Sequence, residues 1–433
     1  MLRDDLLEAI REIPAIDVHS HLARDRMTAP DAGALMFYHM LLYCLRAAGV
    51  PDAKLWPGKG GMHGRGRPLA EWFQAWPAIE NTAFAWVLKS ILRDLYEFDE
   101  PVTAESYPRL EAAYAAKAGR PDWARQVLAK ANVVRVLSSA HQVAPLREGE
   151  FDGGVRFTYE SAPTGGTSEF VPWKDRLAGM ARHFGREITT AERLREAVAA
   201  FYAPVDWSDK HALVAWISSE ADFRPVDDAT IDQLLGDAAA GKAIEPEGLR
   251  LLEAAVVRAI CRAIRGRAPA FQICYGVQFV TREENSLHPV ARAAPEFASS
   301  LAHLVGEFPD IHFNMLNGFE ADEPVWCAMA QGYRNFSLAC FWWETFYPSV
   351  MHRALDRRLD MVPTPRLMAF FSDGYSVDYI YGRMSLVRRV LARVLAEKVE
   401  DGWYTKAHAL GIAREILLET PRRIFLPDEA IDA

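Results

Sequence analysis

The feature that most constrains the fold of this chain is an alternation of short β-forming runs with stretches of helical periodicity. The helical stretches include 189–200 and 247–264, and the eight predicted strands are 16–22, 132–138, 155–160, 212–218, 270–276, 311–316, 335–342 and 367–373. An open doubly wound sheet would need a glycine-rich loop after the first strand, where the chain has Ser20-His21-Leu22-Ala23. The sequence therefore predicts an α/β fold, a (β/α)8 TIM barrel.

The helices are distributed unevenly along the chain. Residues 1–22 are expected to form an N-terminal helix and the first barrel strand. Residues 23–130 carry helical signals and little strand signal, so they are predicted to be a large helical insertion after the first strand. Residues 131–433 are predicted to form the remainder of the barrel.

Charge and cysteine content limit the classes of partner. A net charge of −9 argues against nucleic acid and against an anionic membrane surface, which favours a small-molecule substrate. Five cysteines in no paired pattern predict no disulfide framework and fit a reducing cytoplasm. We read no signal peptide and no transmembrane run, and a homo-oligomer is compatible with this composition.

The motif most suggestive of chemistry is His19-x-His21 at the end of the first predicted strand. Side chains at i and i+2 share one face of a strand, so the two imidazoles converge. Alone, the pair is as readily explained as two packed or surface histidines. Asp373 ends the eighth predicted strand, which neighbours the first in a closed barrel, although it could instead be a helix cap. Together the three residues predict a catalytic metal site with an open position.

Other strand ends offer weaker candidates. His141 follows the second strand and could contact metal or substrate, but a lone loop histidine is more often merely solvated. Cys274 ends the fifth strand, where a thiolate could bind the metal, although most single cysteines are small buried hydrophobes. Trp342 and Trp343 could wall a pocket that stacks on a sugar ring, or could be core and rim packing.

Two further groups of polar residues have structural explanations. Asp17 shares the face of His19 and could orient an imidazole, but a buried carboxyl satisfied by backbone is slightly preferred. The arginines of the last long helix are interpreted as a solvated, ion-paired face: Arg383, Arg388, Arg389 and Arg393.

These residues resemble the amidohydrolase superfamily and, within it, the uronate isomerase branch. The metal motif of the superfamily is matched by His19-x-His21 and Asp373. The branch is indicated by the long helical insertion, with Arg46-Ala47-Ala48-Gly49-Val50 and segment 81–96, and by three later matches. Those matches are Phe341-Trp342-Trp343, Ser372-Asp373-Gly374-Tyr375-Ser376 and the Arg388-Arg389 helix.

The chain also departs from the pattern of that branch. Cys274 stands where many superfamily members have histidine, and Tyr375 stands where the branch usually has arginine. The tyrosine expected in the early insertion falls at Met40, and an arginine expected after the fifth strand appears as Phe279, with Arg282 three residues on. Fewer arginines mean fewer bidentate partners for a substrate carboxylate. The resemblance therefore leaves open a substrate other than a hexuronate.

The resemblance implies one divalent metal ion, with zinc favoured, because no lysine ends the fourth strand to support a carbamylated two-metal site. The expected reaction is aldose–ketose isomerisation of a small sugar acid, with hydrolysis of an ester, lactone or amide as the alternative. A catalytically silent binding protein ranks third. The expected catalytic residues are Asp373, His141 and Arg282, the expected metal ligands His19, His21, Asp373 and Cys274, and the expected substrate contacts Trp342, Trp343, Tyr375 and Arg46.

Overall fold

The fold is centred on a parallel sheet. The structure, a computed structural model, describes residues 2–55, 67–139, 154–160, 172–216, 221–281, 287–291 and 295–431. The seven-stranded sheet has the order β1-β2-β3-β4-β5-β8-β9, and all of its pairs are parallel. Its strands are β1 (Ala15–Ser20), β2 (Val133–Ser138), β3 (Val155–Glu160), β4 (Lys210–Trp216), β5 (Ala270–Tyr275), β8 (His312–Asn317) and β9 (Phe336–Leu338).

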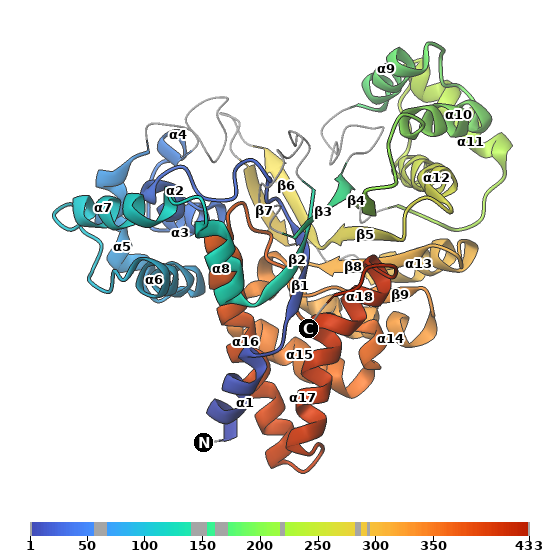
Figure 1. Cartoon of the computed structure of the whole chain (residues 1–433). Coiled ribbons are helices and arrows are strands. Elements are labelled where there is room, and N and C mark those ends of the chain that lie inside the picture. Colours follow the sequence, from blue (N-terminus) through green and yellow to red (C-terminus); the bar gives the residue numbers. More distant parts are fainter. Residues whose placement is uncertain are drawn as a thin grey trace.

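Helices surround this sheet (Figure 1). Helix α1 (Leu2–Arg11) precedes β1, and the described residues between β1 and β2 form α2 (Ala32–Met36), α3 (His39–Ala47), α4 (Asp52–Leu55), α5 (Leu69–Ile79), α6 (Ala83–Tyr96), α7 (Tyr107–Ala118) and α8 (Trp123–Ala131). Between β3 and β5 lie α9 (Trp173–Phe184), α10 (Ala191–Tyr202), α11 (Asp228–Ala239) and α12 (Pro246–Ile264). The rest of the described chain contains α13 (Pro295–Glu307), α14 (Glu323–Gly332), α15 (Pro348–Met361), α16 (Val377–Glu400), α17 (Lys406–Arg414) and α18 (Thr420–Phe425).

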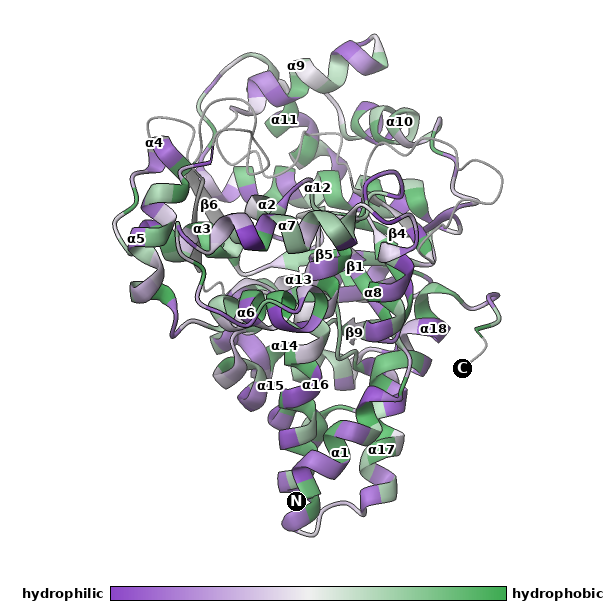
Figure 2. Ribbon diagram, turned by 60° about the vertical axis from the view of Figure 1, so that its left-hand side comes forward, coloured by the Kyte–Doolittle hydropathy of each residue, from purple (hydrophilic) through white to green (hydrophobic). Residues whose placement is uncertain are grey.

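Amphipathic patterning determines how the outer helices pack. Hydrophilic and hydrophobic residues alternate around helix α1 in Figure 2, as expected for a helix with one face on the core, whereas α16 is buried on nearly all sides. Helix α16 packs against α1, α6, α8 and α15. Thr190 caps α10 by accepting a hydrogen bond from the Arg193 N–H. No helix in the described ranges is both long enough and apolar enough to cross a bilayer.

The predicted seventh and eighth strands differ most from the structure. Strand β9 covers only three residues of the predicted 335–342. Residues 367–373 form no regular strand, although Leu367 makes a parallel bridge to Leu338 and the Asp373 N–H donates to the His19 carbonyl. The backbone leaves the regular ladder here because the Ser372 N–H bonds to the Asp17 carboxylate instead of to a neighbouring strand.

A two-stranded hairpin that the sequence reasoning missed follows β5 directly. Strands β6 (Val277–Thr281) and β7 (Leu287–Ala291) pair antiparallel. Gly276 makes the sharp turn between β5 and β6 with a φ of +88°. A Cβ at this position would lie 2.8 Å from the Phe319 Cβ, so only glycine fits the turn without displacing its neighbour.

Candidate metal centre

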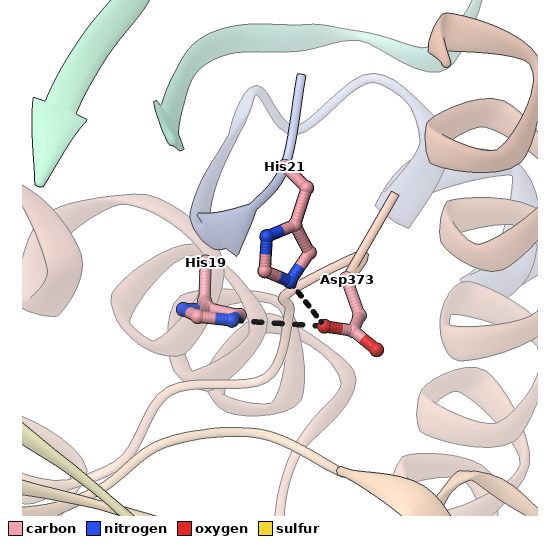
Figure 3. Close-up of side chains that lie close together, drawn as sticks. All are labelled: His19, His21 and Asp373. Carbon is pink, nitrogen blue, oxygen red and sulfur yellow. Dashed lines mark hydrogen bonds and ion pairs between the residues drawn. The ribbon is translucent and has the colours of Figure 1, made fainter. Parts of the chain in front are cut away.

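Three predicted side chains converge at the C-terminal end of β1. His19 and His21 extend from this strand toward Asp373, as Figure 3 shows. The Asp373 Oδ1 lies 3.6 Å from the His19 Nε2 and 3.2 Å from the His21 Nε2. His19 and Asp373 are buried, whereas His21 is partly exposed, so the group is open on the side of His21.

The backbone around Asp373 is fixed from two sides. Asp373 has a left-handed φ of +53°, which aspartate tolerates better than most residues. Its N–H donates to the His19 carbonyl at 3.0 Å, and the His21 N–H donates to the Gly374 carbonyl at 2.9 Å. The Tyr38 hydroxyl donates to the Asp373 carbonyl at 2.9 Å. These bonds hold the end of β1 and the Asp373 loop in register.

A buried contact beneath the three residues joins the same two segments. The Asp17 carboxylate accepts hydrogen bonds from the Ser372 N–H at 2.8 Å and from the Ser372 hydroxyl at 2.5 Å. Asp17 therefore bonds to backbone and to Ser372 rather than to an imidazole ring, in line with the structural interpretation. Burial raises the pKa of Asp17 to about 7, although these hydrogen bonds act in the opposite direction.

A fourth side chain, His39, belongs to the cluster and was missed from the sequence. It is the first residue of α3, and its Nε2 lies 3.4 Å from the Asp373 Oδ2, the oxygen not facing His19 and His21. Burial lowers the pKa of His39 and so favours a neutral ring, and this effect outweighs that of Asp373, which acts in the opposite direction. The sequence signal that could have identified His39 is that it is the single histidine within the apolar segment 35–42, which is buried in the structure.

Electrostatics keep Asp373 ionised. Burial alone would raise its pKa, but hydrogen bonds from His19, His21 and His39 outweigh this and hold the pKa of Asp373 well below its ordinary value. His21 has a further contact, because its Nδ1 lies 2.9 Å from the Ser139 hydroxyl at the end of β2. A protonated Nδ1 donating to Ser139 would leave the His21 Nε2 free of a proton and able to act as a ligand.

The donor set fits a metal ion. The ligand atoms of His19, His21 and Asp373 all lie within 4.8 Å of one another. Ligands about 2.0 Å from a tetrahedral ion lie about 3.3 Å apart, close to the 3.2 and 3.6 Å separations from Asp373. Two imidazole nitrogens and one carboxylate oxygen suit zinc and similar divalent ions and leave a coordination position open.

Solved structures share this architecture. A uronate isomerase from Thermotoga maritima superposes with a TM-score of 0.78 at 14% identity, over 98% of this chain and 97% of the other. A glucuronate isomerase from Caulobacter crescentus gives 0.75 at 16% identity, over 100% and 95%. The chain has the fold of the uronate isomerases. A provisionally assigned metal-dependent hydrolase from Lactobacillus casei shares it more distantly, with a TM-score of 0.55 at 12% identity over 99% of both chains. No family model and no curated protein matches the sequence.

On this uronate isomerase fold, aromatic side chains lie beside the histidines. The Tyr375 ring stacks on the His21 ring with centroids 4.7 Å apart. The Trp343 ring lies 6.0 Å from that of His39, and buried Trp342 packs edge-on against Trp343. Both Tyr375 and Trp343 are partly exposed, so part of each ring faces away from the packed core.

The other candidate residues are not among the convergent ligands of the metal centre, or they lie outside the described residues. Arg46 pairs with Asp52, with 2.5 Å between Nε and Oδ1, and its guanidinium lies over the Tyr43 ring. Cys274 is buried at the end of β5, and its sulfur is not one of the convergent ligand atoms. His141 and Arg282 lie outside the described residues. All five cysteines are among the described residues, and none of them forms a disulfide.

Proposed function

We propose that this protein is a metal-dependent enzyme that isomerises a small sugar acid between aldose and ketose forms. The observation that carries the proposal is the His19–His21–Asp373 cluster on a uronate isomerase fold. We further propose that residues 367–373 close the sheet into a barrel between β9 and β1, with residues 23–130 as an insertion. The hydrogen bonds of this segment to Leu338 and His19 support closure.

His19, His21 and Asp373 would hold one divalent ion, for which zinc is favoured. Such an ion supplies Lewis acidity, which polarises the carbonyl and hydroxyl oxygens of the substrate. Cys274 lies outside the convergent ligand atoms, so we leave it out of the proposed ligand set.

Asp373 would carry the proton transfer. In the proposed step, its carboxylate takes the proton from C2 of the aldose while the C1 oxygen gains a proton, which gives an enediol. The carboxyl group then returns its proton to C1 as the C2 hydroxyl loses its own, so that the net change is one proton from C2 to C1 and one from the C2 oxygen to the C1 oxygen. The two oxygens of Asp373 face different partners, since Oδ1 faces His19 and His21 and Oδ2 faces His39. We assign the metal to Oδ1 and the proton transfer to Oδ2, with His39 positioning the carboxylate.

The substrate would lie against the partly exposed aromatic residues. Tyr375 and Trp343 would pack on the sugar carbons, with Trp342 supporting Trp343. Arg46 stays a substrate contact predicted from the sequence alone, because its guanidinium is paired with Asp52. His141 and Arg282 stay predicted catalytic residues from the sequence alone.

Proton exchange tests the proposed role of Asp373. Purified protein with measured metal content is incubated with a panel of uronates in deuterated water, and loss of the C2 proton is followed by NMR. Asp373→Asn should lower the exchange rate at least about 100-fold, the low end of typical general-base contributions. Asp378→Asn is the matched control, because Asp378 is equally buried but bonds to Tyr96 outside the cluster. Unchanged exchange in Asp373→Asn would exclude the proposed role.

One observation favours hydrolysis as the second candidate. Tyr375 occupies the position where the resemblance predicts a carboxylate-binding arginine, and its ring is stacked on His21. A hydrolase of this kind needs no such arginine. Its nucleophile is a water molecule whose pKa is lowered by the metal ion. Incubation of sugar-acid lactones, esters and amides in oxygen-18 water separates the two reactions. Label in the product without C2 exchange would identify the hydrolase.

A further inference from the structure

A cavity lies at the opposite end of the sheet from the histidine cluster. It has a volume of about 620 Å³ and is enclosed by the end of α1, by α6, by α8 and by the middle of α16. These helices lie together in the lower left part of Figure 1. The cavity borders the residues that precede β1 and β2, whereas His19 and His21 are at the far end of β1.

Its lining is strongly cationic although the chain as a whole carries a charge of −9. Five basic side chains and two acidic ones line the cavity: Arg11, Arg93, Lys130, Arg388 and Arg389, with Glu12 and Asp94. Asp94 is already engaged, because it pairs with the Arg93 guanidinium at 2.7 Å and accepts from the Tyr381 hydroxyl at 3.0 Å. Among the described lining residues, Glu12 is therefore the carboxylate left to offset the charges of Arg11, Lys130, Arg388 and Arg389.

Three of these arginines have no carboxylate partner among the described residues. Arg388 is buried and donates to two backbone carbonyls, of Ala131 at 2.9 Å and Ile13 at 2.8 Å, while its Nε has no partner in the described chain. Arg389 lies over the Trp86 ring at 5.4 Å, and Arg11 is exposed at the rim. The expected solvated, ion-paired face is therefore wrong for Arg388, which lies in the interior. It is also wrong for Arg383, which is buried and donates to the Tyr38 hydroxyl rather than to a carboxylate.

An uncompensated buried guanidinium is expensive to maintain. Removal from water costs several kcal/mol for an ion that lacks an opposite charge. Two effects lower the pKa of Arg388 to about 10: burial, which is the larger, and repulsion by the nearby Arg11. A fall in pKa is expected for a guanidinium with no anion close to it. A bound anion would relieve both effects at once.

We propose that this cavity binds a small metabolite carrying a phosphate group. The five basic and two acidic side chains of the lining leave three positive charges, which is enough to balance a phosphate dianion. Guanidinium groups bind phosphate oxygens through paired hydrogen bonds. The volume exceeds that of inorganic phosphate and lies within the range of about 300–1,000 Å³ usual for ligand pockets. Trp86 and Met384 offer apolar surface to the rest of the ligand.

The site is independent of the proposed isomerase chemistry. Asp373 precedes the first turn of α16, and Arg389 is twelve residues beyond the first residue of that helix, a rise of about 18 Å. Binding at the cavity can therefore be measured without substrate and without turnover.

Calorimetric titration of the full chain at low salt tests the proposal, with glycerol 3-phosphate as probe and malonate as a dicarboxylate of equal charge. The double variant Arg11→Gln/Arg389→Gln removes two exposed charges and should bind the phosphate probe at least about tenfold more weakly. Arg393→Gln is the matched control, because Arg393 is on the same helix but pairs with Glu397 outside the cavity. Its affinity should stay within about twofold of that of the parent chain.

Each outcome decides the matter. The proposal predicts submillimolar binding of glycerol 3-phosphate and weaker binding of malonate. No measurable heat with the phosphate probe, or equal affinity in the double variant and the parent chain, would overturn the site. Equal loss in Arg393→Gln would attribute the binding to general surface charge. Malonate binding as tightly as glycerol 3-phosphate would overturn the assignment to phosphate.

Discussion

Substituting Ser372 with alanine should weaken both the protein and its metal site. Ser372 donates its hydroxyl to the buried Asp17 carboxylate at 2.5 Å and accepts from the Gly374 N–H at 3.0 Å. A hydrogen bond to a charged group contributes about 1.5–3 kcal/mol and a neutral one about 1 kcal/mol. The variant should therefore lose about 3 kcal/mol of unfolding free energy. The measurement is urea denaturation at constant metal concentration and at a pH above the raised pKa of Asp17, where its carboxyl group is ionised.

The effect on the metal should be separable from the effect on stability. Ser372 directly precedes Asp373, and the Asp17 contact ties this segment to the strand that carries His19 and His21. Loss of such a supporting contact typically lowers metal affinity about 10- to 100-fold. Competition with a chromophoric zinc chelator measures the affinity of the folded variant.

Ser337→Ala provides the matched control. Ser337 is also fully buried, and its hydroxyl bonds to the His312 ring and to the Asn314 amide, both at 2.8 Å, away from the cluster. It should lower stability to a similar extent and leave metal affinity unchanged. If Ser372→Ala kept the parent affinity, or if Ser337→Ala lowered it equally, the idea that the Asp17–Ser372 contact positions Asp373 would be refuted.

Three further changes test other contacts. Ser139→Ala removes the hydroxyl beside the His21 Nδ1 and should lower zinc affinity about tenfold in the same competition assay. Glu323→Gln leaves buried Arg358 without its carboxylate and should lower the free energy of unfolding by about 3–5 kcal/mol in urea. Burial lowers the pKa of His312 from 6.5 to about 3, so its contribution to stability is complete above pH 6.5 and is lost toward pH 3. Denaturation at a series of pH values should show a shallower acid slope in His312→Gln, by up to about 1.4 kcal/mol per pH unit.

The sequence predicted the parallel α/β architecture because strand and helix periodicities are local properties. The same local rule brought His19 and His21 to one face of β1, since alternate residues of a strand share a side. The convergence of Asp373 with these residues could be predicted because the first and last strands of a closed barrel are neighbours. These parts of the site were predictable without any knowledge of side-chain contacts.

Contacts between distant segments account for what the sequence did not reveal. The irregular path of 367–373 depends on the Asp17–Ser372 hydrogen bonds, whose partners are 355 positions apart. His39 reaches Asp373 only because α3 folds over the end of β1, and no periodicity indicates that approach. The burial of Arg388 likewise depends on α1 and α8 packing against α16, whereas its local pattern resembles an exposed charged face.

The left-handed backbone at Asp373 limits how the centre could be redesigned. A left-handed conformation costs most residues with a side chain about 1–2 kcal/mol, and aspartate and asparagine are among the few that adopt it readily. An engineer who replaced Asp373 with glutamate to suit a larger ion would meet this backbone cost before any gain in coordination. The main chain thus selects a short carboxylate at this position, and attempts to exchange the metal should begin with the histidines or with the shell around them.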